Sequence, residues 1–231
     1  GLTWLADGLY GDLPIHADGR SYLLTRSAMH SSSGVMPCVA VYLYEDGRVR
    51  RVAALGLAGA FPPLADPEMM EALKIEDLSR HQFLWSDRNG DGEVQAEEVE
   101  LSPARISGLT EPNRDMSCLG MASRYGGEEP CVQFEVRQFL PNGAPVFAET
   151  GTVRLPGGLG YRLSDGSYFH LGATLRADGH AVDQWRGSDG RVRWAWRTLL
   201  GVGVQRWHVP PWTPDAVMME FMRVGHETAG E

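Results

Sequence analysis

Asp-Gly turns recur along this chain and constrain its fold more than any other feature. They stand at residues 18–19, 46–47, 165–166, 178–179 and 189–190, between short stretches of aliphatic and aromatic residues. Both central positions of a two-residue hairpin take a positive φ, which Asp tolerates and Gly adopts without steric cost. The later turns follow one another at intervals of about ten to thirteen residues, a spacing that predicts antiparallel strands joined by hairpins.

The stretches between these turns predict the individual strands. The expected strands are residues 21–24, 39–44, 49–52, 131–136, 145–147, 160–163, 167–171, 174–176 and 191–196. One short helix is expected after Asp66-Pro67-Glu68, which supplies an N-cap, a proline at the first helical position and an early acidic residue. Residues 101–130 contain several prolines and glycines and little periodicity, so a long loop is predicted there.

These elements predict an all-β fold of repeated antiparallel sheets. Regular turns without long helices are typical of a β-propeller, whose four-stranded blades take about 40 to 45 residues each. The 231 residues would hold about four or five such blades, in a ring that is either closed or incomplete. Because the repeats are not clean, a β-sandwich with insertions is the alternative. Neither terminus resembles a natural chain end, so we expect residues 1–231 to be one propeller-like segment of a larger protein.

One stretch, residues 83–99, contains a pattern that specifies a chemistry. Residues 87–98 match the twelve-residue EF-hand-type calcium loop, which has oxygen ligands at positions 1, 3, 5, 7, 9 and 12 and a glycine at position 6. Gly92 takes the sixth position, and the ligands would be Asp87, Asn89, Asp91, the carbonyl of Glu93, Gln95 and Glu98. Carboxylates this close together repel one another unless a cation lies between them. The pattern therefore predicts a Ca²⁺ site.

The surroundings of this loop favour a structural ion over a regulatory one. Residues 81–85 are predicted to form a strand, and Pro103 limits any helix after the loop to about one turn. Val94 is expected to anchor the loop to the core. Calcium sensors use paired loops that open a pair of helices, whereas the other Asp-Gly turns of this chain lack the ladder of carboxylates. Mg²⁺ fits less well because it requires a stiff octahedron, and a solvated acidic turn is the remaining alternative.

Composition excludes several classes of function. The net charge is −9, and Lys and Arg together number 21 without clustering, so nucleic-acid binding is not expected. No stretch approaches the roughly eighteen apolar residues of a membrane helix, so membrane insertion is not expected either. The three cysteines, Cys38, Cys118 and Cys131, permit one disulfide, and Cys118 with Cys131 is the first pair to test.

Other candidate sites are weaker. None of the seven histidines has metal-ligand spacing, and His170, which alternates with Tyr168, is expected to be structural. Nucleophile elbows, phosphate loops and dinucleotide fingerprints are missing from the sequence, so no catalytic residue is assigned. Four tryptophans offer flat faces for stacking on sugar rings, although strand tryptophans more commonly pack in cores. They are Trp194, Trp196, Trp207 and Trp212.

Three stretches together resemble the propeller regions of very large exported bacterial proteins, in which one EF-hand-like calcium loop interrupts a blade. They are residues 83–99, 141–147 and 206–214, of which only the first is specific. The resemblance implies a calcium-bearing propeller in an exported or surface protein. The resemblance does not extend to any particular catalytic activity.

The leading hypothesis is a calcium-stabilised, non-catalytic structural or interaction module of an extracellular or cell-surface bacterial protein, with the periplasm as an alternative location. Its expected partners are other parts of the parent protein or other subunits, and a glycan is a further candidate. The alternative function is a propeller that binds or degrades polysaccharide at its central mouth. A calcium-triggered switch is disfavoured because a second loop is missing.

Overall fold

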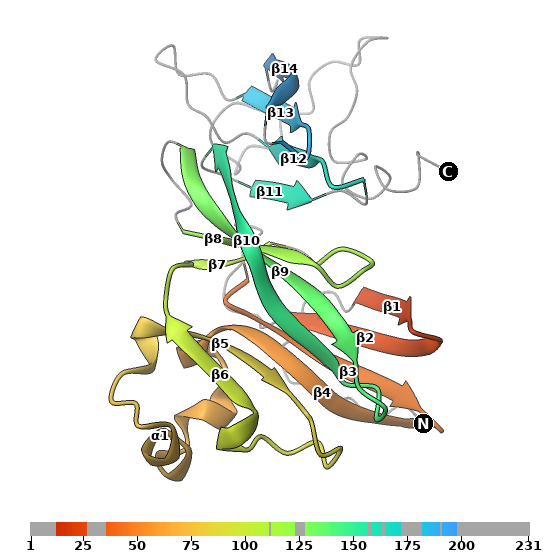
Figure 1. The fold of residues 1–231 in the computed structure, drawn as a ribbon, viewed down its shortest axis with the longest axis vertical. Coiled ribbons are helices and arrows are strands. Elements are labelled where there is room, and N and C mark those ends of the chain that lie inside the picture. The colour runs from red at the N-terminus through yellow and green to blue at the C-terminus, as the bar shows by residue number, and fades with distance from the viewer. Residues whose placement is uncertain are drawn as a thin grey trace, which may run out of the picture.

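The computed structural model describes residues 13–26, 36–110, 112–122, 128–156, 159–162, 165–171, 182–189 and 191–197. Within these ranges the chain forms three antiparallel sheets, one α-helix and four short 3-10 turns. The prediction of an all-β fold with one short helix is therefore confirmed. Figure 1 shows the second sheet lying across the first, and the third sheet at the end of the molecule opposite the α-helix.

The first sheet is a meander whose six strands lie in chain order. They are β1 (Leu13–Ala17), β2 (Arg20–Arg26), β3 (Cys38–Glu45), β4 (Arg48–Leu57), β5 (His81–Ser86) and β6 (Val99–Pro103). Two of the predicted Asp-Gly hairpins lie in this sheet. Asp18 and Asp46 have φ values of 49° and 51°, and Gly19 and Gly47 have 70° and 74°. Local turn chemistry thus sets the register of β1 with β2 and of β3 with β4.

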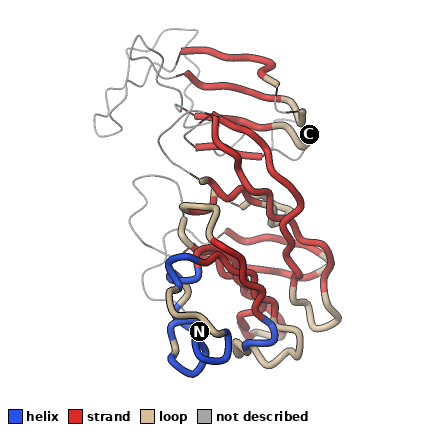
Figure 2. The backbone as a smooth tube through the Cα atoms, turned by 60° about the vertical axis from the view of Figure 1, so that its left-hand side comes forward, coloured by secondary structure: helices blue, strands red, loops and turns tan. Residues whose placement is uncertain are grey.

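Helical segments between β4 and β5 cover one face of the first sheet. They are η1 (Ala58–Ala60), η2 (Pro62–Ala65), α1 (Pro67–Leu73) and η3 (Leu78–Arg80). The predicted start of α1 is confirmed, because the Asp66 side chain accepts a hydrogen bond from the Glu68 amide at 2.9 Å. Phe61 and Leu64 of this segment pack against Phe83 and Trp85 of β5. Figure 2 shows these helices gathered at one end of the molecule.

The second sheet has the order β10-β9-β8-β7. Its strands are β7 (Gly108–Leu109), β8 (Cys118–Met121), β9 (Glu128–Phe139) and β10 (Pro145–Pro156). The predicted long loop over residues 101–130 is therefore wrong. All four residues of β8 are buried, so this strand lacks the polar alternation that marks a half-exposed strand. A Cβ on Gly120 would lie 2.5 Å from Ile106 and 2.8 Å from Phe134, and close packing here requires a glycine.

The third sheet is a meander at the far end of the molecule. It consists of β11 (Leu159–Arg162), β12 (Tyr168–Leu171), β13 (Val182–Arg186) and β14 (Val192–Arg197). Tyr168 of this sheet joins a small buried cluster with Leu119, Met121 and Cys131 of the second sheet. The strand and turn predicted at residues 174–179 lie outside the described residues, as does the stretch 206–214.

The main hydrophobic core lies between the first and second sheets. Val39, Val41 and Leu43 alternate along β3 and point into it, each no more than 2% exposed. From the second sheet, Val132 and Phe134 of β9 meet them. Face-to-face packing of antiparallel sheets is the arrangement of a sandwich, and the described strands do not form a closed ring of blades. The propeller therefore stays a prediction.

The three cysteines are all buried, and no disulfide joins them. Cys118 pairs with Phe134 and faces the main core, whereas Cys131 pairs with Met121 and faces the small cluster around Tyr168. The two side chains therefore lie on opposite faces of the second sheet, and this geometry excludes the disulfide suggested by sequence. Burial raises the pKa of the Cys38 and Cys118 thiols to about 12.

Candidate metal centre

The predicted calcium loop, residues 87–98, connects β5 to β6 of the first sheet. The strand β5 precedes it, as predicted. The helical turn expected after the loop is instead the 3-10 turn η4 (Ala96–Glu98), which forms the last three positions of the loop itself, and the strand β6 follows directly. Val94 packs against the cluster that contains Phe61 and Trp85, as expected of an anchor. Both ends of the loop are thus fixed to a buried part of the sheet.

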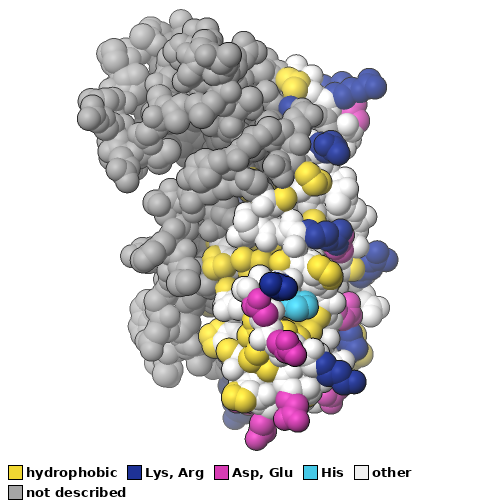
Figure 3. Space-filling model, turned by 90° about the vertical axis from the view of Figure 1, so that its left-hand side faces the viewer, with side chains coloured by type: hydrophobic (Ala, Val, Ile, Leu, Met, Phe, Trp, Pro, Cys, Tyr) yellow, Lys and Arg dark blue, Asp and Glu magenta, His cyan; other side chains and the backbone are white. Residues whose placement is uncertain are grey.

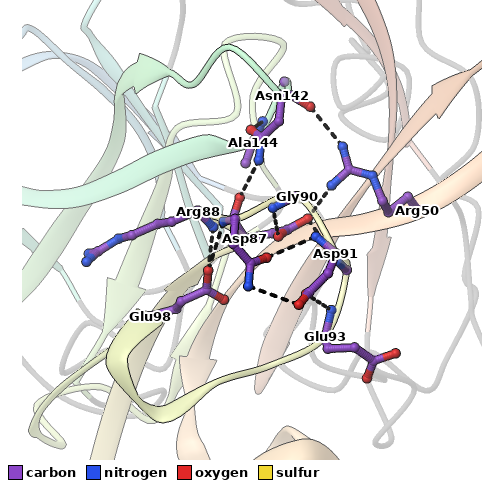
Figure 4. Close-up of polar contacts among 12 residues, drawn as sticks. Arg50, Asp87, Arg88, Gly90, Asp91, Glu93, Glu98, Asn142 and Ala144 are labelled. Carbon is purple, nitrogen blue, oxygen red and sulfur yellow. Dashed lines mark hydrogen bonds and ion pairs between the residues drawn. The ribbon is translucent and has the colours of Figure 1, made fainter.

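Asp87, the predicted first ligand, is fully buried and holds the start of the loop. Its Oδ1 accepts a hydrogen bond from the Gly90 amide at 2.7 Å, and its Oδ2 accepts one from the Gly92 amide at 3.2 Å. The guanidinium of Arg50 forms an ion pair with the same Oδ2 (Figure 4). Gly90 and Gly92 have φ values of 87° and 77°, which let the backbone coil around this carboxylate.

The next predicted ligands form a ladder in which each side chain accepts from a backbone amide two residues later. Asn89 Oδ1 accepts from the Asp91 amide at 2.9 Å, and Asp91 Oδ1 accepts from the Glu93 amide at 2.8 Å. Asp91 Oδ2 also accepts from Asn89 Nδ2 at 2.9 Å and from Gln95 Nε2 at 2.7 Å. These bonds, led by the one from the Glu93 amide, lower the pKa of Asp91. Asp91 is therefore a carboxylate at neutral pH.

Glu98, the predicted last ligand, closes the loop and is only 4% exposed. Its Oε1 accepts from the amides of Arg88 and Asn89 at 2.7 and 3.1 Å. Its Oε2 accepts from the indole Nε1 of Trp85 at 3.1 Å. The two ends of the loop are therefore joined through one buried carboxylate.

One buried oxygen of the loop has no hydrogen-bond partner in the described part of the chain. Gln95 Oε1, at the ninth ligand position, is buried and has no hydrogen-bond partner among the described residues. A buried oxygen without a donor is costly, and a bound cation would satisfy it. Within the described ranges no three His, Cys, Asp or Glu side chains cluster as metal ligands. The predicted ligand set also includes amide and carbonyl oxygens. Oxygen donors of this mixture suit Ca²⁺.

The loop is also hydrogen-bonded to the second sheet. Asn142, in the turn between β9 and β10, donates from Nδ2 to the Asp87 carbonyl at 2.8 Å. Arg50 donates from Nη2 to the Asn142 carbonyl, also at 2.8 Å, and Ser86 donates from Oγ to the Pro145 carbonyl at 2.9 Å. Figure 4 shows Arg50 and Asn142 on one side of the loop. Sequence reasoning missed both residues because the partners are 37 and 55 positions apart and leave no local pattern.

The structure says little about the other candidate residues, which are a histidine and four tryptophans. His170 lies on β12 and Trp194 and Trp196 lie on β14, but the side chains of these residues are not among those described. Trp207 and Trp212 lie outside the described residues. In the part of the chain that is described, no helix is both long and apolar enough to cross a membrane.

Comparison with known proteins adds no further constraint. No protein-family model matches the chain, and neither a curated protein nor a solved structure matches it.

Proposed function

We propose that this chain is a calcium-stabilised, non-catalytic structural or interaction module of an exported or surface bacterial protein. The observation that carries the proposal is the oxygen of Gln95, buried without a partner at a ligand position of a loop whose other predicted ligands are already ordered. Asp87, Asn89, Asp91, Gln95 and Glu98 would hold the ion through their side chains. The carbonyl of Glu93 would supply the remaining protein ligand.

The position of the loop supports a stabilising role for the ion. The loop closes a hairpin between β5 and β6, and its first residue is tied through Arg50 and Asn142 to the β9–β10 turn. An ion bound there would hold the first and second sheets together at one edge. Strands and a 3-10 turn, instead of two long helices, flank the loop, so calcium has no helix pair to open.

We also propose that the three sheets belong to a β-propeller. This proposal is supported by the resemblance at residues 83–99 and 141–147 and by the succession of antiparallel meanders along the chain. The β-sandwich with insertions is the alternative, favoured by the six strands of the first sheet and its packing on the second.

Calcium sites of extracellular modules need only weak affinity, which suits an exported protein.

Two adjacent glutamates provide a matched test of the calcium site. Calcium at about 100 times its dissociation constant should raise the free energy of unfolding by about 2.7 kcal/mol. Glu98→Gln removes a ligand charge and should abolish this gain, whereas Glu97→Gln changes an exposed neighbour at a non-ligand position and should keep it. Urea unfolding of the three chains in calcium and in chelator measures the difference. Equal responses of the two variants, or no response of the unmodified chain, would contradict the proposal.

A further inference from the structure

A cleft of about 540 Å³ lies between the second and third sheets. In Figure 1 the third sheet is at the end of the molecule opposite the helices. Its lining includes Gln133 of β9, Thr152 and Arg154 of β10, and Arg186 of β13. We propose that this cleft binds a carboxylate-bearing saccharide. The inference does not depend on calcium, because none of the predicted metal ligands lines the cleft.

The charge of the cleft is opposite to that of the whole chain. Three arginines, Arg154, Arg186 and Arg191, line it together with a single carboxylate, Asp189, which leaves a formal charge of +2. The chain as a whole carries −9. In Figure 3, Lys and Arg side chains predominate over acidic ones in the upper part of the described surface, whereas both kinds are mixed lower down. The excess of positive charge in the lining favours binding of an anion there, although the chain as a whole is negative.

The single carboxylate is held within the wall of the cleft. Asp189 Oδ1 accepts from the Arg191 amide at 3.0 Å, and its Oδ2 forms ion pairs with Arg193 at 3.0 Å and with Arg191 Nε at 3.9 Å. Arg154 and Arg191 are exposed, and Arg186 is only 7% exposed. The cleft thus combines one arginine fixed by burial with two that can reach a ligand from the rim.

The size and chemistry of the lining favour a sugar acid over a simple anion. A cleft of this volume accommodates a small organic ligand, whereas a phosphate ion would fill only a small part of it. The planar guanidinium group binds carboxylates through two parallel hydrogen bonds. The Gln133 amide and the Thr152 and Ser188 hydroxyls add groups that both donate and accept, which is what the hydroxyls of a sugar ring require.

Calorimetric titration of the full chain with digalacturonic acid tests the inference, with the matching neutral galactose disaccharide and inorganic phosphate as comparison ligands. We expect binding of the sugar acid that weakens with added salt, and little binding of the neutral sugar. Arg154→Gln and Arg191→Gln should each weaken binding about five- to ten-fold, since each removes one charge-assisted contact. Arg80→Gln, which removes an equally exposed arginine from the helical end, is the matched control and should change nothing.

A fourth variant should strengthen binding and so exclude misfolding as the explanation. Asp189→Asn keeps the oxygen that accepts from the Arg191 amide but removes the competing charge, so it should bind the sugar acid a few-fold more tightly. The inference is wrong if the acidic and neutral disaccharides bind equally, or if only phosphate binds. It is also wrong if the Arg154 and Arg191 variants bind like Arg80→Gln. The Glu98→Gln variant should bind the sugar acid normally, so failure of the calcium site and failure of the cleft are distinguishable.

Discussion

Replacement of Asp87 by alanine tests the buried network that organises the loop. This carboxylate is fully buried and accepts hydrogen bonds from the amides of Gly90 and Gly92 and from the guanidinium of Arg50. Asp87→Ala leaves two backbone donors and a cation without their partner. The loss should appear even in chelator, because these contacts do not involve a metal ion.

The magnitude follows from the three contacts. Each backbone donor left without an acceptor costs about 1 kcal/mol, toward the low end of the usual range because the loop can admit water. Breaking a buried ion pair by removing one partner costs about 3 to 5 kcal/mol, and the lower value applies since the Arg50 side chain is 29% exposed. We therefore expect Asp87→Ala to lower the free energy of unfolding by about 5 kcal/mol.

Urea denaturation in chelator, followed by tryptophan fluorescence, measures this loss. The matched control is Asp91→Ala, which removes another predicted calcium ligand from the same loop, but an exposed one. In chelator, the control should lose much less stability than Asp87→Ala, whereas in calcium both variants should lose the stabilisation by the ion. If Asp87→Ala costs less than about 1 kcal/mol in chelator, the buried network does not hold the loop.

Two further predictions concern the second sheet. Gly120→Ala should destabilise the fold by about 1 to 3 kcal/mol, because the new methyl group would overlap Ile106 and Phe134. Gly151→Ala, in β10 of the same sheet, meets only an ordinary contact with Gln133 and should cost little. Thermal unfolding of both variants checks this, and equal losses would refute it. The buried thiols of Cys38 and Cys118 predict a loss of stability in alkali. Their pKa is about 12 in the folded chain, whereas the ordinary value is 9.0. Above pH 9 the thiols therefore ionise only in the unfolded chain, and the free energy of unfolding falls as the pH rises. Urea unfolding between about pH 8 and pH 10 should show a slope that is shallower in Cys118→Ala by up to about 1.4 kcal/mol per pH unit, and identical slopes would contradict the assignment.

Sequence reasoning succeeded where a few neighbouring residues determine the structure. The Asp-Gly hairpins of the first sheet follow from the φ values that Asp and Gly adopt. The start of α1 follows from its N-cap, Asp66, and from Pro67 at the first helical position. The bounds of the loop at residues 87–98 could be predicted because the hydrogen bonds within the loop join residues only two to ten positions apart. All of these contacts lie within one stretch of chain.

Sequence reasoning failed where the burial or the contacts of a residue are determined by residues far away in the sequence. The strand β8 is buried on both faces, so its sequence shows neither alternation nor a polar side. The contacts of Arg50 and Asn142 with the loop depend on the first and second sheets packing together, which no local pattern specifies. The cleft between the second and third sheets likewise gathers arginines that are scattered along the sequence.

Terbium luminescence tests the central claim, that one metal ion binds at residues 87–98. Tb³⁺ occupies oxygen-ligand calcium sites and emits when a nearby excited indole transfers energy to it, and the Trp85 indole lies 3.1 Å from Glu98 Oε2. An ion bound in the loop should give sensitised emission that saturates at one Tb³⁺ per chain, is displaced by Ca²⁺, and is lost in Glu98→Gln but retained in Glu97→Gln. Emission that does not saturate, or that is equally strong in both variants, would show that the loop is not a metal site.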